Sequence, residues 1–445
     1  MDDVVDLAYR VLKVLRDRGI EGDVYCEYSR EISAECREGR FQTASVTEEK
    51  GLGLRVIVDK RVGFVYTSKI SESPVDLVEK ACKIARICSR VDKWRGLPHP
   101  GKFPNVPDIY SPELENTTID NVLDNVNKFL KEYEKDRQVF SFWVAEIGTS
   151  FSKIFLLNSE GVEATYSETT SIAFIEVNAR KGSYVTPGVY EADYSKTRLV
   201  DLVEVYEKAK EKAQSLLDPI KIEEKSLSVV LTTKALSELL SNTIKPMLTA
   251  SSFALKMSPF IDKIGQELFS RELTLIDDAT VPGGLSSAPF DDEGVPTRRN
   301  VLIENGVLKG VISNIYWGSM IDMDSTGNGF RGGYSSMPGI SYTNIEILPG
   351  TIKLDEVYNS EEPILLVDYV QGAHTSNPVT GEFSVAAPCS WIIRKGEKKP
   401  VKGVMISGKL YEILRDVKFT KERETLLNFT LPYMYVPRGL ISIAT

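Results

Sequence analysis

Three consecutive acidic residues are the first candidates for chemistry in this sequence. They are Asp291, Asp292 and Glu293. Neighbouring carboxylates can serve as general acid and base or bind a divalent cation. These acids lack the alternating spacing and the twelfth-position glutamate of a calcium loop, and Arg298 and Arg299 follow closely enough to pair with them. We therefore predict a structural loop held by ion pairs, with a catalytic or metal-binding role as the alternative.

The acidic loop leads into a predicted β-hairpin. The segments NVLIE and GVLKG alternate in sidedness around Asn305 and Gly306. Asn-Gly favours a two-residue type I′ turn, because both turn positions need positive φ. We therefore predict that the three acidic residues shape the loop that leads into this hairpin.

Other residue types that often carry catalysis are sparse. Neither His99 nor His374 has a second histidine and an acid at metal-ligand spacing, so both are predicted to be solvated loop residues. Residues 327–332 match the pattern GxGxxG, but Pro338 and Gly339 follow where a dinucleotide-binding fingerprint needs a helix. We interpret this segment as a glycine-rich loop. The sequence contains neither a phosphate-binding Walker motif nor a Gly-x-Ser-x-Gly elbow.

The five cysteines show no paired short spacing, which fits reduced thiols in a cytoplasmic protein. Cys82 and Cys88 lie six residues apart on a predicted helix and are expected to be core thiols. Cys26 and Cys36 could face each other across a hairpin, so a disulfide between them stays open.

Composition narrows the class of protein. The chain has 445 residues, 42% of them hydrophobic, which predicts two or three globular domains. A net charge of −9 disfavours a nucleic-acid partner, since phosphate contacts need a basic face. No run of about 18 apolar residues occurs, so no membrane contact is expected, and the N-terminus is unlike a signal peptide.

Periodicity predicts the elements that must position these residues. Helical spacing recurs over residues 4–18, 74–91, 118–136 and 198–217. Alternating polar and apolar residues lie between the first and second of these segments, and again between the third and fourth. They predict antiparallel strands, four or five of them in the first unit. The order helix, strands, helix thus occurs twice, which leaves an internal duplication open.

From residue 226 the sequence pattern predicts mainly strands and loops. A buried strand over 227–233 precedes a short helix over 234–248 that Pro246 ends or bends, and a late helix is predicted over 409–417. This predicts an α+β fold with mostly antiparallel sheets and flanking helices. The expected division is an N-terminal domain over 1–95, a proline-rich linker over 96–112, a central unit over 113–222 and a C-terminal β-rich domain over 223–445.

Three stretches of the C-terminal part together resemble the conserved landmarks of the TldD/PmbA family. They are APFDDEGVPTRRNVLIENGVLKG (288–310), DSTGNGFRG (324–332) and NPVTGEFSVAAPCSWIIRKGEKKPVKG (377–403). This family was once described as modulators of DNA gyrase and is understood as a cytoplasmic metalloprotease of two related subunits, TldD and TldE (PmbA). The resemblance implies an α+β fold and substrates that are peptides or unfolded polypeptides.

The sequence departs from the family's catalytic pattern. The catalytic subunit carries a zinc motif HExxxH, expected here within residues 232–280, and a cysteine ligand near the C-terminus. No histidine occurs in that range and no cysteine near the end, and the nearest match is the hexapeptide Ser237-Glu238-Leu239-Leu240-Ser241-Asn242. Glu238 is then the one candidate relic of the catalytic site. We expect no metal ligand and no cofactor in this chain, and zinc in a TldD-like partner.

The resemblance therefore implies a TldE/PmbA-type, non-catalytic subunit of a zinc metalloprotease, which pairs with a TldD-like catalytic subunit and forms a homodimer when alone. Two alternatives stay open. The chain could be an independent peptidase with an unrecognised site, or a binding and regulatory protein that works without a protease partner.

Overall fold

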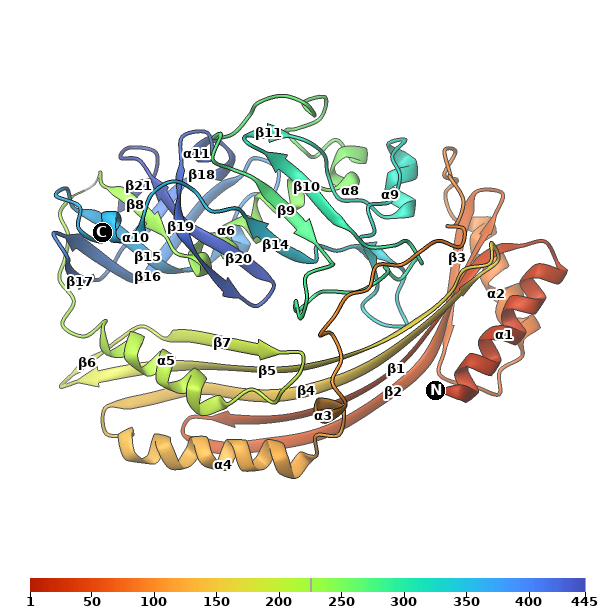
Figure 1. Cartoon of the computed structure of the whole chain (residues 1–445), viewed down its shortest axis with the longest axis horizontal. Coiled ribbons are helices and arrows are strands. Elements are labelled where there is room, and N and C mark those ends of the chain that lie inside the picture. Colours follow the sequence, from red (N-terminus) through yellow and green to blue (C-terminus); the bar gives the residue numbers. More distant parts are fainter. Residues whose placement is uncertain (225, 445) are drawn as a thin grey trace.

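The computed structural model describes residues 1–224 and 226–444, which form a long curved sheet beneath a C-terminal lobe (Figure 1). The curved sheet has seven strands in the order β3-β2-β1-β4-β5-β6, with β7 also paired to β5. Its strands are β1 (Glu21–Arg37), β2 (Arg40–Val58), β3 (Arg61–Thr67), β4 (Phe140–Asn158), β5 (Glu163–Lys181), β6 (Tyr184–Val185) and β7 (Val189–Ser195). Both helix–strands–helix units thus contribute to one sheet, joined where β1 pairs with β4 along almost its whole length.

The strands are longer and fewer than the sequence analysis predicted. The segments expected as separate strands over 22–30 and 31–39 form the single strand β1, because no glycine or proline interrupts them and both edges stay paired. The tight turn after β2 is as predicted, with positive φ at Asp59 and Lys60.

The disulfide considered between Cys26 and Cys36 is ruled out by this geometry. Both residues lie on β1, ten positions apart, which separates them by ~33 Å along an extended strand. All five cysteines are free thiols, and four of them, including these two, are buried. The hairpin that would have let the two face each other does not form, because no turn lies between them.

Helices cover one face of the curved sheet. Helices α1 (Asp2–Asp17) and α2 (Pro74–Ile87) pack on one end, and α4 (Ile119–Asp136) and α5 (Leu202–Gln214) pack further along. Their starts follow the sequence closely. Ser73 caps α2, whose first residue is a proline, and Thr118 forms a capping box with Asn121 at the start of α4.

The C-terminal lobe is built on a twelve-stranded sheet in the order β11-β10-β9-β14-β20-β8-β15-β16-β18-β21, with β17 on β16 and β19 on β20. Only the pairs β14–β20 and β8–β15 are parallel, so the predicted α+β class with mostly antiparallel sheets is confirmed. The strands are β8 (Ser228–Leu231), β9 (Leu275–Asp278), β10 (Arg299–Glu304), β11 (Val307–Leu308), β14 (Asn344–Ile347), β15 (Ile364–Gln371), β16 (Glu382–Arg394), β17 (Glu397–Val401), β18 (Met405–Lys409), β19 (Lys418–Leu426), β20 (Phe429–Val436) and β21 (Ser442–Ala444). A separate pair joins β12 (Gly329–Phe330) to β13 (Gly339–Ile340).

The helices of this lobe are short. They are α6 (Thr233–Asn242), α7 (Ile244–Met247), α8 (Ala250–Ala254), α9 (Ile315–Met320), α10 (Leu354–Tyr358) and α11 (Leu410–Ile413), and α3 (Pro112–Glu115) precedes α4. The predicted helix over 234–248 breaks at Thr243, ahead of Pro246, and the late helix is a single turn. Among the described residues, no helix is long and apolar enough to cross a membrane.

Candidate functional site

The acidic loop after Phe290 is buried between the curved sheet and the C-terminal lobe. Asp291, Asp292 and Glu293 are each at most 4% exposed. One oxygen of Asp291 accepts the N–H groups of Glu293 and Val295, and the other accepts that of Gly329. With three backbone donors on its two oxygens and no exposed surface, this carboxylate shapes the loop and is out of reach of a substrate.

Glu293 belongs to a buried ion cluster that joins the two parts of the molecule. Arg55 on β2 contacts Glu293 Oε1 through Nη1 (2.5 Å) and Asp23 Oδ2 through Nε (2.6 Å). Arg331 of the C-terminal lobe contacts the other oxygen of Asp23 (2.9 Å). Burial alone would lower the pKa of Arg55, but the two carboxylates raise it above its ordinary value.

The predicted ion pairs of this loop involve other arginines than expected. Arg298 contacts Asn300 and the carbonyl of Ser325, and Arg299 lies 3.9 Å from Asp278. Both side chains are exposed, because β10 starts here at the rim of the lobe while the acids turn inward. The prediction of a structural, ion-paired loop is therefore right, and the predicted partners are wrong.

Asp292 gives the stability of the fold a pH dependence. Burial raises the pKa of Asp292 to about 7, although the N–H of Arg331 donates to this carboxylate (2.7 Å). An aspartate free of the fold titrates near 3.8, so the folded chain holds an extra proton between these two values. The stability contributed by Asp292 therefore falls as the pH rises from about 4 to about 7, and is level above that.

Asp292→Asn is expected to flatten this part of the pH profile, because asparagine carries no charge at any pH. The difference in unfolding free energy between variant and wild type should change by on the order of 4 kcal/mol between pH 4 and pH 8. Denaturant unfolding at several pH values measures it. An unchanged difference across this range would show that Asp292 stays ionised in the fold.

The glycine-rich segment 327–332 is extended and precedes no helix, as predicted. Asn328 is buried and donates to Asp277 Oδ2 (2.6 Å). A Cβ at Gly329 would lie 2.5 Å from Glu293 Oε2, so glycine allows this strand to approach the acidic loop. The glycine-rich segment therefore packs against the buried ion cluster.

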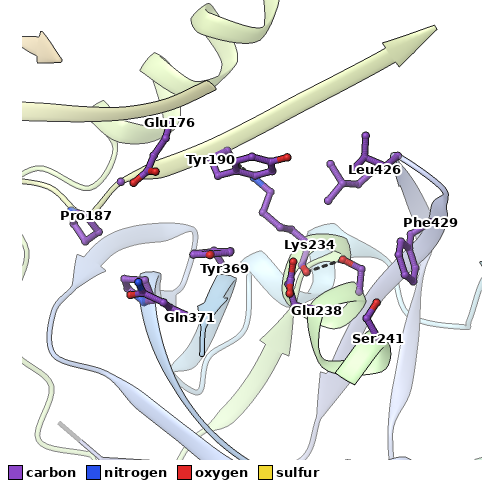
Figure 2. Close-up of a pocket in the computed structure, with 14 residues that line it drawn as sticks. Glu176, Pro187, Tyr190, Lys234, Glu238, Ser241, Tyr369, Gln371, Leu426 and Phe429 are labelled. Atoms are coloured by element: carbon purple, nitrogen blue, oxygen red, sulfur yellow. Dashed lines mark hydrogen bonds between the residues drawn. The ribbon is translucent and has the colours of Figure 1, made fainter. Parts of the chain in front are cut away.

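Glu238 lies on the wall of a cavity between the curved sheet and the C-terminal lobe (Figure 2). The cavity has a volume of about 510 Å³. Its lining comes from β5, the turn before β7, β7 itself, α6, β15, β16 and the β19–β20 turn. The lining residues are Glu176, Pro187, Gly188, Tyr190, Lys234, Ser237, Glu238, Ser241, Tyr369, Gln371, Pro388, Leu426, Leu427 and Phe429.

The hexapeptide around Glu238 does not form a metal site. Ser237 Oγ donates to the carbonyl of Lys234 (2.9 Å), and Asn242 Nδ2 donates to the carbonyl of Glu238 (2.8 Å). Both side chains thus satisfy the backbone of their own helix. Within residues 1–224 and 226–444, no group of three or more histidine, cysteine, aspartate or glutamate side chains could hold a metal ion. The residues present therefore do not fit a catalytic zinc.

The two histidines occupy different surroundings. His99 is exposed and lies 3.7 Å from Glu160. His374 is exposed on a 3-10 turn that contacts α6. Burial raises the pKa of Glu238, and the nearby His374 opposes this rise. The predicted loop positions are thus confirmed, and the proximity of His374 to Glu238 was not foreseen.

The fold and the site together define this molecule as a two-lobed α+β protein with a cavity between its lobes. Models of the PmbA/TldA metallopeptidase family match three segments: domain 1 at residues 22–85, the central domain at 111–217 and the C-terminal domain at 224–442. The chain belongs to the PmbA/TldD metallopeptidase family.

Relatives of full length agree with this assignment. An uncharacterized protein of Methanocaldococcus jannaschii is 30% identical over 92% of this chain and 93% of its own length. A metalloprotease TldD homolog of Haemophilus influenzae is 24% identical over 94% of this chain and 88% of its own. The crystal structure of TldE from Thermococcus kodakarensis superposes with a TM-score of 0.89 at 29% identity, covering 98% of this chain and all of the other.

Proposed function

We propose that this chain is a TldE/PmbA-type subunit without a catalytic zinc of its own. It works with a TldD-like partner that carries the zinc, on peptides or unfolded polypeptides. The observation that carries the proposal is the state of α6 at the cavity. Where a zinc helix would present two histidines, Ser237 and Asn242 are hydrogen-bonded to the backbone of their own helix, and no zinc ligands accompany Glu238.

The chemistry of these residue types supports a non-catalytic role. A serine hydroxyl and a carboxamide are poor zinc ligands beside imidazole and thiolate. A glutamate without an adjacent metal has no metal-bound water to deprotonate. The retained cavity then serves as part of a chamber wall, and a chamber between lobes admits extended chains and excludes folded domains.

Zinc content and peptide cleavage test the proposal together. The untagged chain, purified without its partner, is expected to contain far less than one zinc per chain by elemental analysis and to leave an unfolded casein substrate intact. Addition of the TldD-like protein should produce cleavage that a chelator abolishes, with a mixed assembly visible by light scattering.

Two other results would contradict the proposal. Near one zinc per chain with chelator-sensitive cleavage by the pure chain would make it an independent peptidase. Failure to assemble with a TldD-like protein, together with stable capture of a different client, would make it a binding or regulatory protein. The homodimer expected of the isolated chain is checked in the same light-scattering run.

A further inference from the structure

Two carboxylates face the same cavity. Glu176 projects from β5 and Glu238 from α6, on different walls of the same space (Figure 2). Within the described parts of the chain, neither side chain takes part in an ion pair or a hydrogen bond. Partial burial raises the pKa of Glu238 and the nearby His374 opposes this rise, while the side chain stays exposed enough for a ligand to reach it.

The local backbone makes room for one of these carboxylates. Oε1 of Glu176 lies only 1.9 Å from where a Cβ at Gly188 would stand. A side chain at position 188 would force this carboxylate to shift, which glycine avoids. The strand–turn–strand unit from β5 to β7 therefore leaves room for this carboxylate at the cavity.

The only lysine that lines the cavity within the described residues is already neutralised. Lys234 Nζ contacts Glu191 Oε1 at 2.8 Å and donates to the carbonyl of Tyr190. Its side chain is 8% exposed and directed toward β7. The space in front of Glu176 and Glu238 thus carries a net negative charge.

Aromatic and apolar side chains complete the space. Tyr190, Tyr369 and Phe429 line it together with Pro187 and Leu426. Faces of aromatic rings attract ammonium and guanidinium groups, and apolar neighbours suit the methylene stem that carries such a group. Unpaired carboxylates beside aromatic rings form the kind of surface that binds a cation on an alkyl chain.

We propose that this cavity binds the basic side chain, lysine or arginine, of a peptide. This inference rests on the proposed function for its ligand, a polypeptide in the chamber, and adds which residue of the polypeptide the non-catalytic subunit selects. Glu176 and Glu238 supply the countercharge, and Tyr369 flanks the cation. The cavity thereby sets where along a peptide the chain is held.

Binding of matched peptides to the full-length chain tests the proposal. The probes are acetylated and amidated pentapeptides Ala-Ala-Xaa-Ala-Ala with Xaa as lysine, norleucine or glutamate, measured by isothermal titration calorimetry at low salt. We expect the lysine peptide to bind about 10-fold tighter than the norleucine peptide, and the glutamate peptide weakest. The preference should shrink as salt is added.

Glu176→Gln and Glu238→Gln keep the size of the side chains and remove the charges. Each is expected to reduce the lysine preference by about 3-fold or more, and the double variant to abolish it. Glu207→Gln, on the exposed side of α5 away from the cavity, is the matched control and should bind as the wild type does. Thermal unfolding of each variant verifies that the fold is intact.

Two outcomes would overturn the proposal. One is equal binding of the lysine and norleucine peptides by the wild type, or a preference that survives in the double variant. The other is selective binding of a norleucine peptide with a free N-terminus, which would assign the cavity to an amino terminus. Because these titrations need neither partner nor zinc, their failure is separate from failure of the proposed subunit role.

Discussion

Arg55→Met is expected to lower the free energy of unfolding by about 3–5 kcal/mol. The arginine is fully buried and lies between Asp23 and Glu293, at 2.6 Å and 2.5 Å. Methionine fills much of the same volume but leaves two buried carboxylates without their shared partner. Denaturant unfolding, followed by fluorescence of the tryptophans, measures the loss.

Arg298→Met is the matched control for this variant. Arg298 was the partner that sequence proximity suggested for the acidic loop, yet its side chain is exposed and contacts Asn300 and a backbone carbonyl. Its replacement should change the unfolding free energy by less than about 0.5 kcal/mol. Equal effects of the two replacements would mean that the buried cluster does not hold the lobes together.

Glu191→Gln is expected to lower the free energy of unfolding by about 2–4 kcal/mol. Glu191 on β7 accepts from Lys212 of α5 (2.6 Å) and from Lys234 of α6 (2.8 Å). Asp368 on β15 also contacts Lys212 (2.9 Å). Removing the shared carboxylate leaves Lys234 with a backbone carbonyl as its main acceptor and weakens the link between the curved sheet and α6.

Hydrogen exchange distinguishes a local effect from a global one in this variant. Amides of α6 should exchange faster in Glu191→Gln, because the helix that carries Glu238 loses its tie to β7. Glu207→Gln removes an exposed contact to Lys210, which keeps Asp136, and should change stability by less than about 0.5 kcal/mol. Unaltered exchange of α6 together with wild-type stability would contradict the role given to Glu191.

The two ion clusters have a common consequence for the cavity. One joins β1 and β2 to the acidic loop, and the other joins α5 and β7 to α6 and β15. Each holds the curved sheet against the C-terminal lobe at a different place, so the cavity walls formed by β5, β7 and α6 keep a fixed spacing. Rigid walls are what a binding site for one side chain of a flexible peptide requires.

Local sequence signals predicted the elements well. The positions of the long helices follow from amphipathic periodicity, from Pro74 at a helix start and from the cap at Thr118. These signals act within a few residues of the chain. Positive φ at Asn305 and Gly306 confirms the predicted hairpin turn for the same reason. Where prediction failed, as in cutting β1 in two, the deciding interactions came from β2 and β4 on either side.

The candidate site was only partly visible in the sequence. Glu238 was singled out as the nearest match to the family's zinc motif, and the structure places it on the cavity wall. No sequence signal marks the other cavity residues Glu176, Tyr190 and Tyr369. A glutamate and two tyrosines on strands with alternating polar and apolar residues look like any half-exposed strand residues. They meet only because β5, β7 and β15 lie around one space.

The sequence by itself determined the α+β class, the family, and the absence of histidines from the region where a zinc motif is expected. It could not determine which charges meet, because Arg55 and Glu293 are 238 residues apart and electrostatic pairing depends on distance in space. Tertiary structure made that choice by burying both groups at one interface, where an ion is stable only beside its opposite. The same fold brought Glu176 and Glu238 to one cavity without an ion-pair partner among the described residues, and so placed two carboxylates where a cationic ligand can reach them.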